Sequence, residues 1–145
     1  MESAMKTFLF LIISTLLSFG AIAQSKTITS DVKFNSVVVL QDLQGDVQIQ
    51  SWDKQTIQIT SEDGTVLKVF KTDEVVFISP VNGNESNSTK YIIYLPKTSK
   101  LDWFSTDANL SIKGELAALK LENETGNTTL DLQNTVPSVL AYTSN

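Results

Sequence analysis

The chain has 145 residues and a formal net charge of −5 at pH 7, and it contains no Cys, His or Arg, so all 11 positive side chains are Lys. This composition excludes zinc sites of the usual Cys/His kind, thiol catalysis and Ser-His triads. The lack of guanidinium groups and the negative net charge also argue against nucleic acid as a partner, and no cofactor is predicted.

Residues 1–23 have the organisation of a secretory signal peptide. Lys6 supplies the positive start, residues 8–19 form an apolar run, and Ala21-Ile22-Ala23 matches the small-residue pattern of a cleavage site. The run is short for a transmembrane helix, although an uncleaved membrane anchor is the alternative. No Cys follows the run to carry a lipid. We therefore expect an exported protein of the periplasm, the cell surface or the medium, with no transmembrane segment after cleavage.

The mature chain is predicted to be a single β-rich domain over residues 32–145, preceded by a loose polar lead at residues 24–31. Apolar pairs recur at a spacing of ten, as Val37/Val39, Val47/Ile49, Ile57/Ile59 and Leu67/Val69, and Phe77 extends the pattern. Period-two alternation predicts half-buried strands, with each pair facing the core. Ten residues for a strand and a turn suit antiparallel hairpins and also half a turn of a two-sided solenoid. The pairing direction over residues 36–80 therefore stays open.

The second half of the chain continues this pattern. The apolar pairs are Leu110/Ile112, Leu119/Leu121 and Leu130/Leu132, nine and then eleven residues apart, with polar turn residues between them. Such repetition predicts an all-β stack of short strands, either a β-solenoid or a meander. Residues 81–90 contain three Asn and are predicted to form an exposed loop.

The C-terminal end of the predicted stack lacks a cap. Val139 and Ala141 form the last apolar pair, and no charged residue follows Asp131. Solenoid ends are normally covered, because an open rung (one turn of the stack) presents unpaired backbone groups. We therefore expect either that the domain is truncated at the C-terminus or that it self-associates through its C-terminal rung. The alternative is that Pro137 and the polar tail fold over this rung and cover it.

Some oxygen-bearing side chains are candidates for chemistry. Asp102, Asp107 and Asn109 are candidate Ca²⁺ ligands, but their spacing matches neither an EF-hand nor the glycine-rich calcium repeat, and ordinary turn capping is the alternative. The carboxylates of Asp102 with Asp107, or of Glu122 with Glu124, are candidates for a glycosidase pair. Because the repeat places them on outward faces in solvent, neither a catalytic residue nor a metal site is predicted.

Three aromatic residues are candidates for contact with a partner. Trp52, Trp103 and Phe104 could form an aromatic platform for a glycan or a surface protein. The alternative is structural: two of them would close the ends of the core and the third would be a surface strand residue.

Three segments of the sequence resemble a bacterial exported family known as "putative adhesins", or as head domains of autotransporter adhesins. The segments are LQGDVQIQSWD at residues 43–53, IIYLPK at residues 92–97 and ETGNTTL at residues 124–130. The resemblance implies a mostly parallel, right-handed β-helical stack with some antiparallel hairpins, and it implies no known catalytic residue. The chain departs from the family pattern at Ala108, where a glycine is usual, and it ends where members commonly continue.

These observations predict a non-catalytic function. We expect an exported structural or adhesive surface module of unknown ligand, and not an enzyme, because a stack of short strands offers a long surface for weak contacts at several points. The alternative is a polysaccharide-acting β-helical enzyme that uses paired carboxylates.

Signal peptidase is predicted to cut between Ala23 and Gln24, because the A-x-A pattern ends at Ala23. Mass spectrometry of the exported protein should find Gln24, or its cyclised form, at the N-terminus. An exported protein that retains Met1 or Met5 would contradict this assignment.

Overall fold

The computed structural model describes residues 24–81 and 89–134, and the backbone of 140–142. The regular secondary structure of these residues consists of β-strands alone, so the all-β prediction is confirmed. The eleven strands are β1 (Lys26–Asp31), β2 (Val37–Gln41), β3 (Gly45–Trp52), β4 (Thr56–Ser61), β5 (Leu67–Lys71), β6 (Val75–Pro80), β7 (Lys90–Pro96), β8 (Lys100–Gly114), β9 (Ala118–Thr125), β10 (Thr128–Leu132) and β11 (Leu140–Tyr142). Nowhere in this described part is a helix long and apolar enough to cross a membrane.

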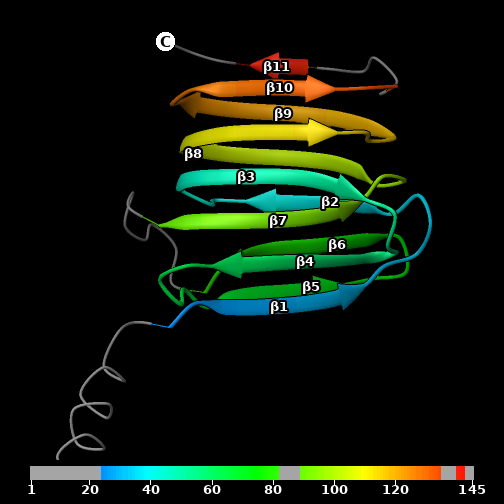
Figure 1. Ribbon diagram of the computed structural model, residues 1–145, viewed down its shortest axis with the longest axis horizontal. Helices are drawn as coiled ribbons and strands as arrows, with labels where there is room; N and C mark the ends of the chain where they lie inside the picture. Colours follow the sequence, from blue (N-terminus) through cyan, green and yellow to red (C-terminus); the bar gives the residue numbers. More distant parts are fainter. Residues whose placement is uncertain (1–23, 82–88, 135–139, 143–145) are drawn as a thin grey trace, which may run out of the picture.

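The strands form one mixed sheet that curls over on itself into two layers (Figure 1). The front layer has the strand order β1-β4-β7-β3-β8-β10, and the back layer has the order β5-β6-β2-β8-β9-β11. Strand β8 belongs to both, because its residues 100–107 pair in the back layer and its residues 108–114 pair in the front layer.

Parallel and antiparallel ladders occupy different parts of the stack. Strands β2, β3, β6 to β11 are joined by parallel pairs, whereas the pairs β1/β4, β4/β7 and β5/β6 are antiparallel. The pairing direction over residues 36–80 is therefore mixed. The antiparallel pairs that were expected lie at the end of the stack that holds β1 and β5 (Figure 1).

The core lies between the two layers and contains four of the eight predicted inward pairs. Val47/Ile49, Ile57/Ile59, Leu110/Ile112 and Leu119/Leu121 are all at most 2% exposed. Their neighbours in the sequence face outward, as period-two alternation requires. The predicted register is confirmed for these four strands.

The predicted phase is wrong for β2 and β6. Val38 and Leu40 are fully buried, while Val37 and Val39 are only partly buried and face outward. Phe77 is likewise 42% exposed. Both segments are apolar on two consecutive positions or more, so alternation alone does not indicate which face is buried.

At the ends of the stack, the side chains predicted to face the core are only partly covered. Leu67 packs against the core, but Val69 is 41% exposed. Leu130 pairs in register with the buried Ile112, yet it is 39% exposed. Strands β5 and β10 each have one neighbouring strand among the described residues, so core atoms cover these side chains from one side only.

Residues 26–31, predicted to be loose, instead form the edge strand β1. They pair antiparallel with β4, and Ile28 packs partly against the core. Lys71, at the end of β5, donates a hydrogen bond to the backbone oxygen of Asp31, at the end of β1. The polar composition concealed this strand because Ile28 is its one apolar residue. The signal peptide, most of the predicted loop at residues 81–90 and Val139 lie outside the described residues.

Loss of core packing should be costlier at Leu121 than at Leu130. Leu121→Ala removes a side chain that is 1% exposed and should lower the free energy of unfolding by about 2–5 kcal/mol. Leu130→Ala is the matched control and should cost roughly 1 kcal/mol or less, because the side chain is already in contact with water. Denaturant titration measures both values, and equal losses would contradict the burial described here.

Candidate functional site

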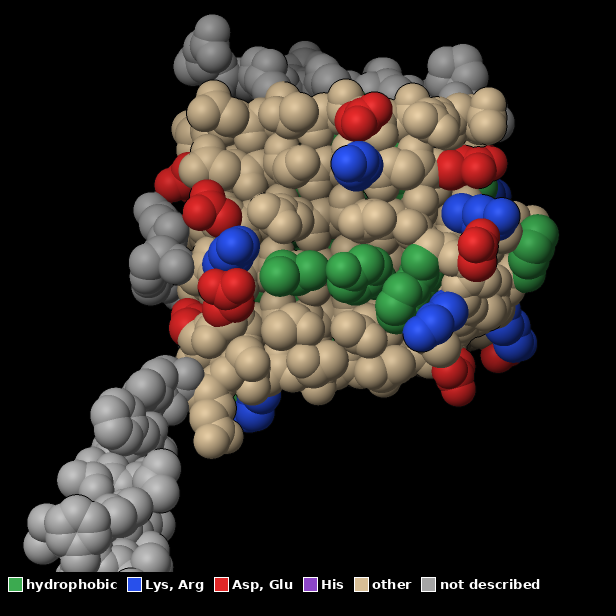
Figure 2. All heavy atoms as spheres, viewed as in Figure 1, with side chains coloured by type: hydrophobic (Ala, Val, Ile, Leu, Met, Phe, Trp, Pro, Cys, Tyr) green, Lys and Arg blue, Asp and Glu red, His purple; other side chains and the backbone are tan. Residues whose placement is uncertain are grey.

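The outer face of the front layer is mostly uncharged and carries a row of hydrophobic side chains across its middle (Figure 2). Ile92 and Tyr94 lie two apart on β7, so they share this face, and Trp52 stands at the end of the neighbouring strand β3. All three are partly buried. We call these three residues the aromatic row.

Trp52 is held in one orientation by three contacts. Its ring stacks on Tyr94 with centroids 4.8 Å apart and an angle of 22° between the planes. Its indole N–H donates to the backbone oxygen of Thr56 over 2.7 Å. The ammonium of Lys54 lies 4.9 Å from the ring centroid, within the range of a cation–π contact. The pair is therefore a rigid feature of the face.

The turns beside Trp52 fix the end of the row. The backbone N–H of Lys97 donates to the oxygen of Trp52 over 3.1 Å, and the Lys97 ammonium lies 2.9 Å from the Asp53 carboxylate. Its hydrogen bond and charge interaction with Asp53 raise the pKa of Lys97. Both side chains are more than half exposed, so this pair adds little to stability.

A shallow groove runs beside the aromatic row, over β3. Side chains of β3 lie along its middle, those of β7 along one side and those of β8 along the other. Its volume is about 120 Å³, and it is lined by Gln48, Ile49, Gln50, Ile92, Tyr94, Ser111 and Lys113. We call this hollow the β3 groove.

The start of β7, which carries two residues of the row, is tied down by Asp63 in the β4–β5 turn. One carboxylate oxygen of Asp63 accepts hydrogen bonds from the Ser61 hydroxyl, the Thr65 N–H and the Thr65 hydroxyl, over 2.5–2.9 Å. The other oxygen accepts from the Thr89 hydroxyl over 2.8 Å. Partial burial would raise the pKa of Asp63, but these hydrogen bonds outweigh it and hold the pKa well below its usual range.

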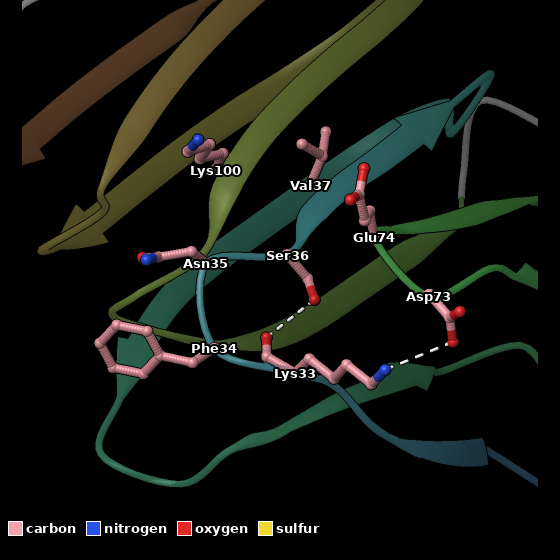
Figure 3. A pocket seen from close by; sticks show the side chains of 8 residues that line it. All are labelled: Lys33, Phe34, Asn35, Ser36, Val37, Asp73, Glu74 and Lys100. Carbon is pink, nitrogen blue, oxygen red and sulfur yellow. Dashed lines mark hydrogen bonds and ion pairs between the residues drawn. The ribbon is translucent and has the colours of Figure 1, made fainter.

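A larger bowl of about 530 Å³ lies where β2 begins (Figure 3). Its wall contains an exposed ion pair, with the Lys33 ammonium 3.3 Å from the Asp73 carboxylate. The Ser36 hydroxyl donates to the backbone oxygen of Lys33 over 2.8 Å, which fixes the turn. Phe34 is 69% exposed and points away from the ion pair (Figure 3). The bowl holds two Lys and two acidic residues, so its charges balance.

The back layer also presents apolar side chains to solvent. Phe70 and Phe77 are a cross-strand pair with ring centroids 6.3 Å apart, and they are 62% and 42% exposed. Val39 is the neighbour of Phe77 on β2. Polar side chains border this patch: Lys68 and Ser79 are a cross-strand pair beside the two rings, and Asp102 is the neighbour of Val39 on β8.

The three aromatic residues singled out from the sequence do not form one platform. Trp103 is fully buried in the core and is not available to a partner. Phe104 is partly buried on the outer face of the back layer, whereas Trp52 lies on the front layer. Adjacent strand residues point to opposite faces, so Trp103 and Phe104 could not have acted together.

Tyr94 and Ile92, which complete the aromatic row, were missed in the sequence. The available signal was the unbroken run YIIYL at residues 91–95. Since only alternate residues of a strand face one core, such a run also places apolar side chains on the outer face.

The oxygen-bearing candidates are also separated. Asp102 lies in the back layer, whereas Asn109 lies in the front layer, where it donates to Asp46 and accepts from the N–H of Asn127. Glu122 and Glu124 share the solvent face of β9. Within the described residues, no group of three or more His, Cys, Asp and Glu is placed to hold a metal ion.

Comparison with solved structures finds adhesins again, at low identity. The chain is similar to a "putative adhesin" from Bacteroides fragilis, with 17% identity, a TM-score of 0.46, and coverage of 81% of this chain and 55% of that one. A "putative adhesin" from Parabacteroides merdae has 18% identity and a TM-score of 0.40, with coverage of 75% of this chain and 52% of that one. A "putative lipid binding protein" from Parabacteroides distasonis has 13% identity and a TM-score of 0.41, with coverage of 76% of this chain and 59% of that one. The chain thus spans between 52% and 59% of these three structures. No family model and no curated protein matches it.

The hydrogen bonds of Asp63 make stability depend on pH. A carboxylate with a lowered pKa stabilises the fold above its unfolded pKa of about 4, and this contribution is lost as the pH falls toward the folded value. Asp63→Asn should therefore lower the free energy of unfolding by about 1 kcal/mol at pH 7, after allowance for solvent screening.

Urea titrations of both proteins from pH 7 to pH 2 test this. The difference between them should shrink below about pH 4. A difference that stays constant over the whole range would contradict the charged hydrogen-bond network.

Proposed function

We propose that the protein is an exported, non-catalytic adhesive module that contacts its partner through the outer face of the front layer. The observation that carries the proposal is the stacked Trp52–Tyr94 pair on the mostly uncharged outer face of the front layer. Large aromatic side chains on a surface are costly to solvate, and their polar tips suit a contact that is partly wet.

Rigidity supports a binding role for this pair. The hydrogen bond to Thr56 and the stack on Tyr94 already restrict the Trp52 ring. A partner therefore loses little affinity to ordering these side chains, which is the advantage of a pre-organised surface. The partner would be a glycan or a surface protein.

The stacked arrangement of the strands favours an extended contact with a partner. The parallel ladders of β3 with β7 and β8, and of β8 with β9, support a short solenoid-like stack, and the resemblance to exported adhesins implies that it is right-handed. Successive strands of such a stack repeat their outward positions at a regular spacing, so a partner meets several similar contacts.

The positions of the carboxylates do not favour a glycosidase. Glycosidase pairs flank the bond that they cleave, inside a cleft that holds the sugar. Glu122 and Glu124 are exposed on β9 and line neither the β3 groove nor the bowl. Asp73 in the bowl is paired with Lys33. The polysaccharide-acting enzyme therefore remains the second candidate.

Two further parts of the proposal concern location and assembly. The signal-like residues 1–23 support export to the periplasm, the cell surface or the medium. Self-association through the C-terminal rung is a separate prediction, and light scattering of the purified chain tests it.

An adhesion assay tests the front face. Cells that display the chain are washed over plates coated with glycans or with surface proteins, and the retained fraction is counted. Tyr94→Ala removes half of the stacked pair and should reduce retention about tenfold, as the loss of one aromatic contact implies.

Phe104→Ala is the matched control, since Phe104 is also a partly buried aromatic residue but lies on the back layer. It should leave retention within about twofold of the original, as expected for a side chain outside the interface. Equal losses in the two variants, at equal display levels, would overturn the assignment of the front face.

A further inference from the structure

We propose that the β3 groove binds an uncharged oligosaccharide, which lies along β3 with a sugar ring against Tyr94. This inference rests on the proposed binding role of the front face and names the class of its ligand. The chemistry of the groove, its shape and the state of its polar groups each support it.

The groove has one apolar wall and one polar wall. Ile92 and Tyr94 of β7 stand on one side of Gln48 and Gln50, while Ser111 and Lys113 of β8 stand on the other. A sugar ring has the same two-sided character, with C–H groups on its faces and hydroxyl groups around its edge. The two walls therefore match a ring that stands in the groove.

The groove is large enough to hold only one part of an extended ligand. Its 120 Å³ is well below the roughly 300–1,000 Å³ of pockets that enclose a whole small molecule. On β3 the hollow itself is lined by residues 48–50, and the outward positions of the strand from Asp46 to Trp52 continue its line over about 20 Å, from the rise of a strand. A linear chain of sugars fits this length, with the deepest contact at Gln48 and Gln50.

The polar side chains of the groove are not engaged by other protein groups. Among the described residues, Gln48, Gln50 and Ser111 make no side-chain hydrogen bond to protein, so their donors and acceptors are available. Outside the groove, by contrast, Thr27 is bonded to Thr60 over 2.9 Å, and Asn109 to Asp46 over 3.1 Å. The amides of Gln48 and Gln50 and the hydroxyl group of Ser111 are therefore available to a hydroxyl-rich ligand.

Other classes of ligand fit less well. Lys113 is the one charged residue in the lining of the groove, and an anionic polymer would require more positive charge. An extended peptide normally adds to a free strand edge, but β3 is paired on both sides, with β7 and with β8. A lipid chain would leave the amide floor without partners.

Tyr94 is the anchor of the proposed site. Its ring stacks on Trp52, and its side chain also lines the groove. The stack therefore orients the ring before a ligand arrives, and the phenol group remains free to exchange a hydrogen bond with a hydroxyl group.

The first experiment identifies the class of ligand. The purified chain is applied to an array of neutral and acidic oligosaccharides of three to six sugars, and any neutral ligand found is titrated by calorimetry. We expect binding to neutral members that changes less than about twofold between 50 and 500 mM salt, since few charges are screened.

The second experiment places the ligand in the groove. Gln48→Ala and Gln50→Ala should each raise the Kd about three- to tenfold, because each removes amide hydrogen bonds. Gln41→Ala is the matched control: Gln41 is an equally exposed strand residue on the opposite layer, and its loss should change the Kd less than twofold. Thermal unfolding of the three variants verifies that they fold alike.

The outcomes separate this inference from the proposed function. Equal weakening by Gln41→Ala and Gln50→Ala would overturn the groove as the site, and salt-sensitive binding to acidic members alone would overturn the uncharged ligand. If the array shows no binding while Tyr94→Ala still reduces cell retention, the glycan class fails and the adhesive face stands. If retention is also unaffected, both fail.

Discussion

The backbone pairing of β8 is the constraint on which the rest of the structure depends. Its 15 residues pair with β2 and β9 in the back layer and with β3 and β10 in the front layer. The two layers are therefore fixed in register by a single covalent strand. Leu101 and Trp103 enter the core from one half of β8, and Leu110 and Ile112 enter from the other half.

The candidate site follows from this arrangement. Once alternate residues of β3, β7 and β8 are committed to the core, the remaining residues of the three strands are aligned on the outside. Ile92, Gln48 and Ser111 then stand side by side, as do Tyr94, Gln50 and Lys113. The mixture of apolar, amide and charged side chains across the face is set by register, and no loop is needed to assemble it.

The sequence predicted strand positions well, because polar and apolar residues alternate clearly around Ile57 and Leu121. It failed at Val37 and Phe77, where neighbouring residues are also apolar and the phase is decided by tertiary packing. It named Trp52 as a candidate for contact with a partner but did not pair it with Tyr94, since the aromatic stack joins residues 42 positions apart through the β3–β7 ladder. A single sequence does not specify which strands become neighbours.

Strands β1 and β5 lie at the same end of the two layers, and each pairs with one strand in the described part of the chain. Exposed edges of this kind are templates for unwanted pairing between chains. Here Lys68 and Lys71 flank the apolar part of β5, and Lys71 reaches across to the backbone of Asp31 in β1. An incoming strand would have to displace that contact and desolvate the ammonium groups. Copies of the protein that lie close together are therefore kept from fusing their sheets through this end.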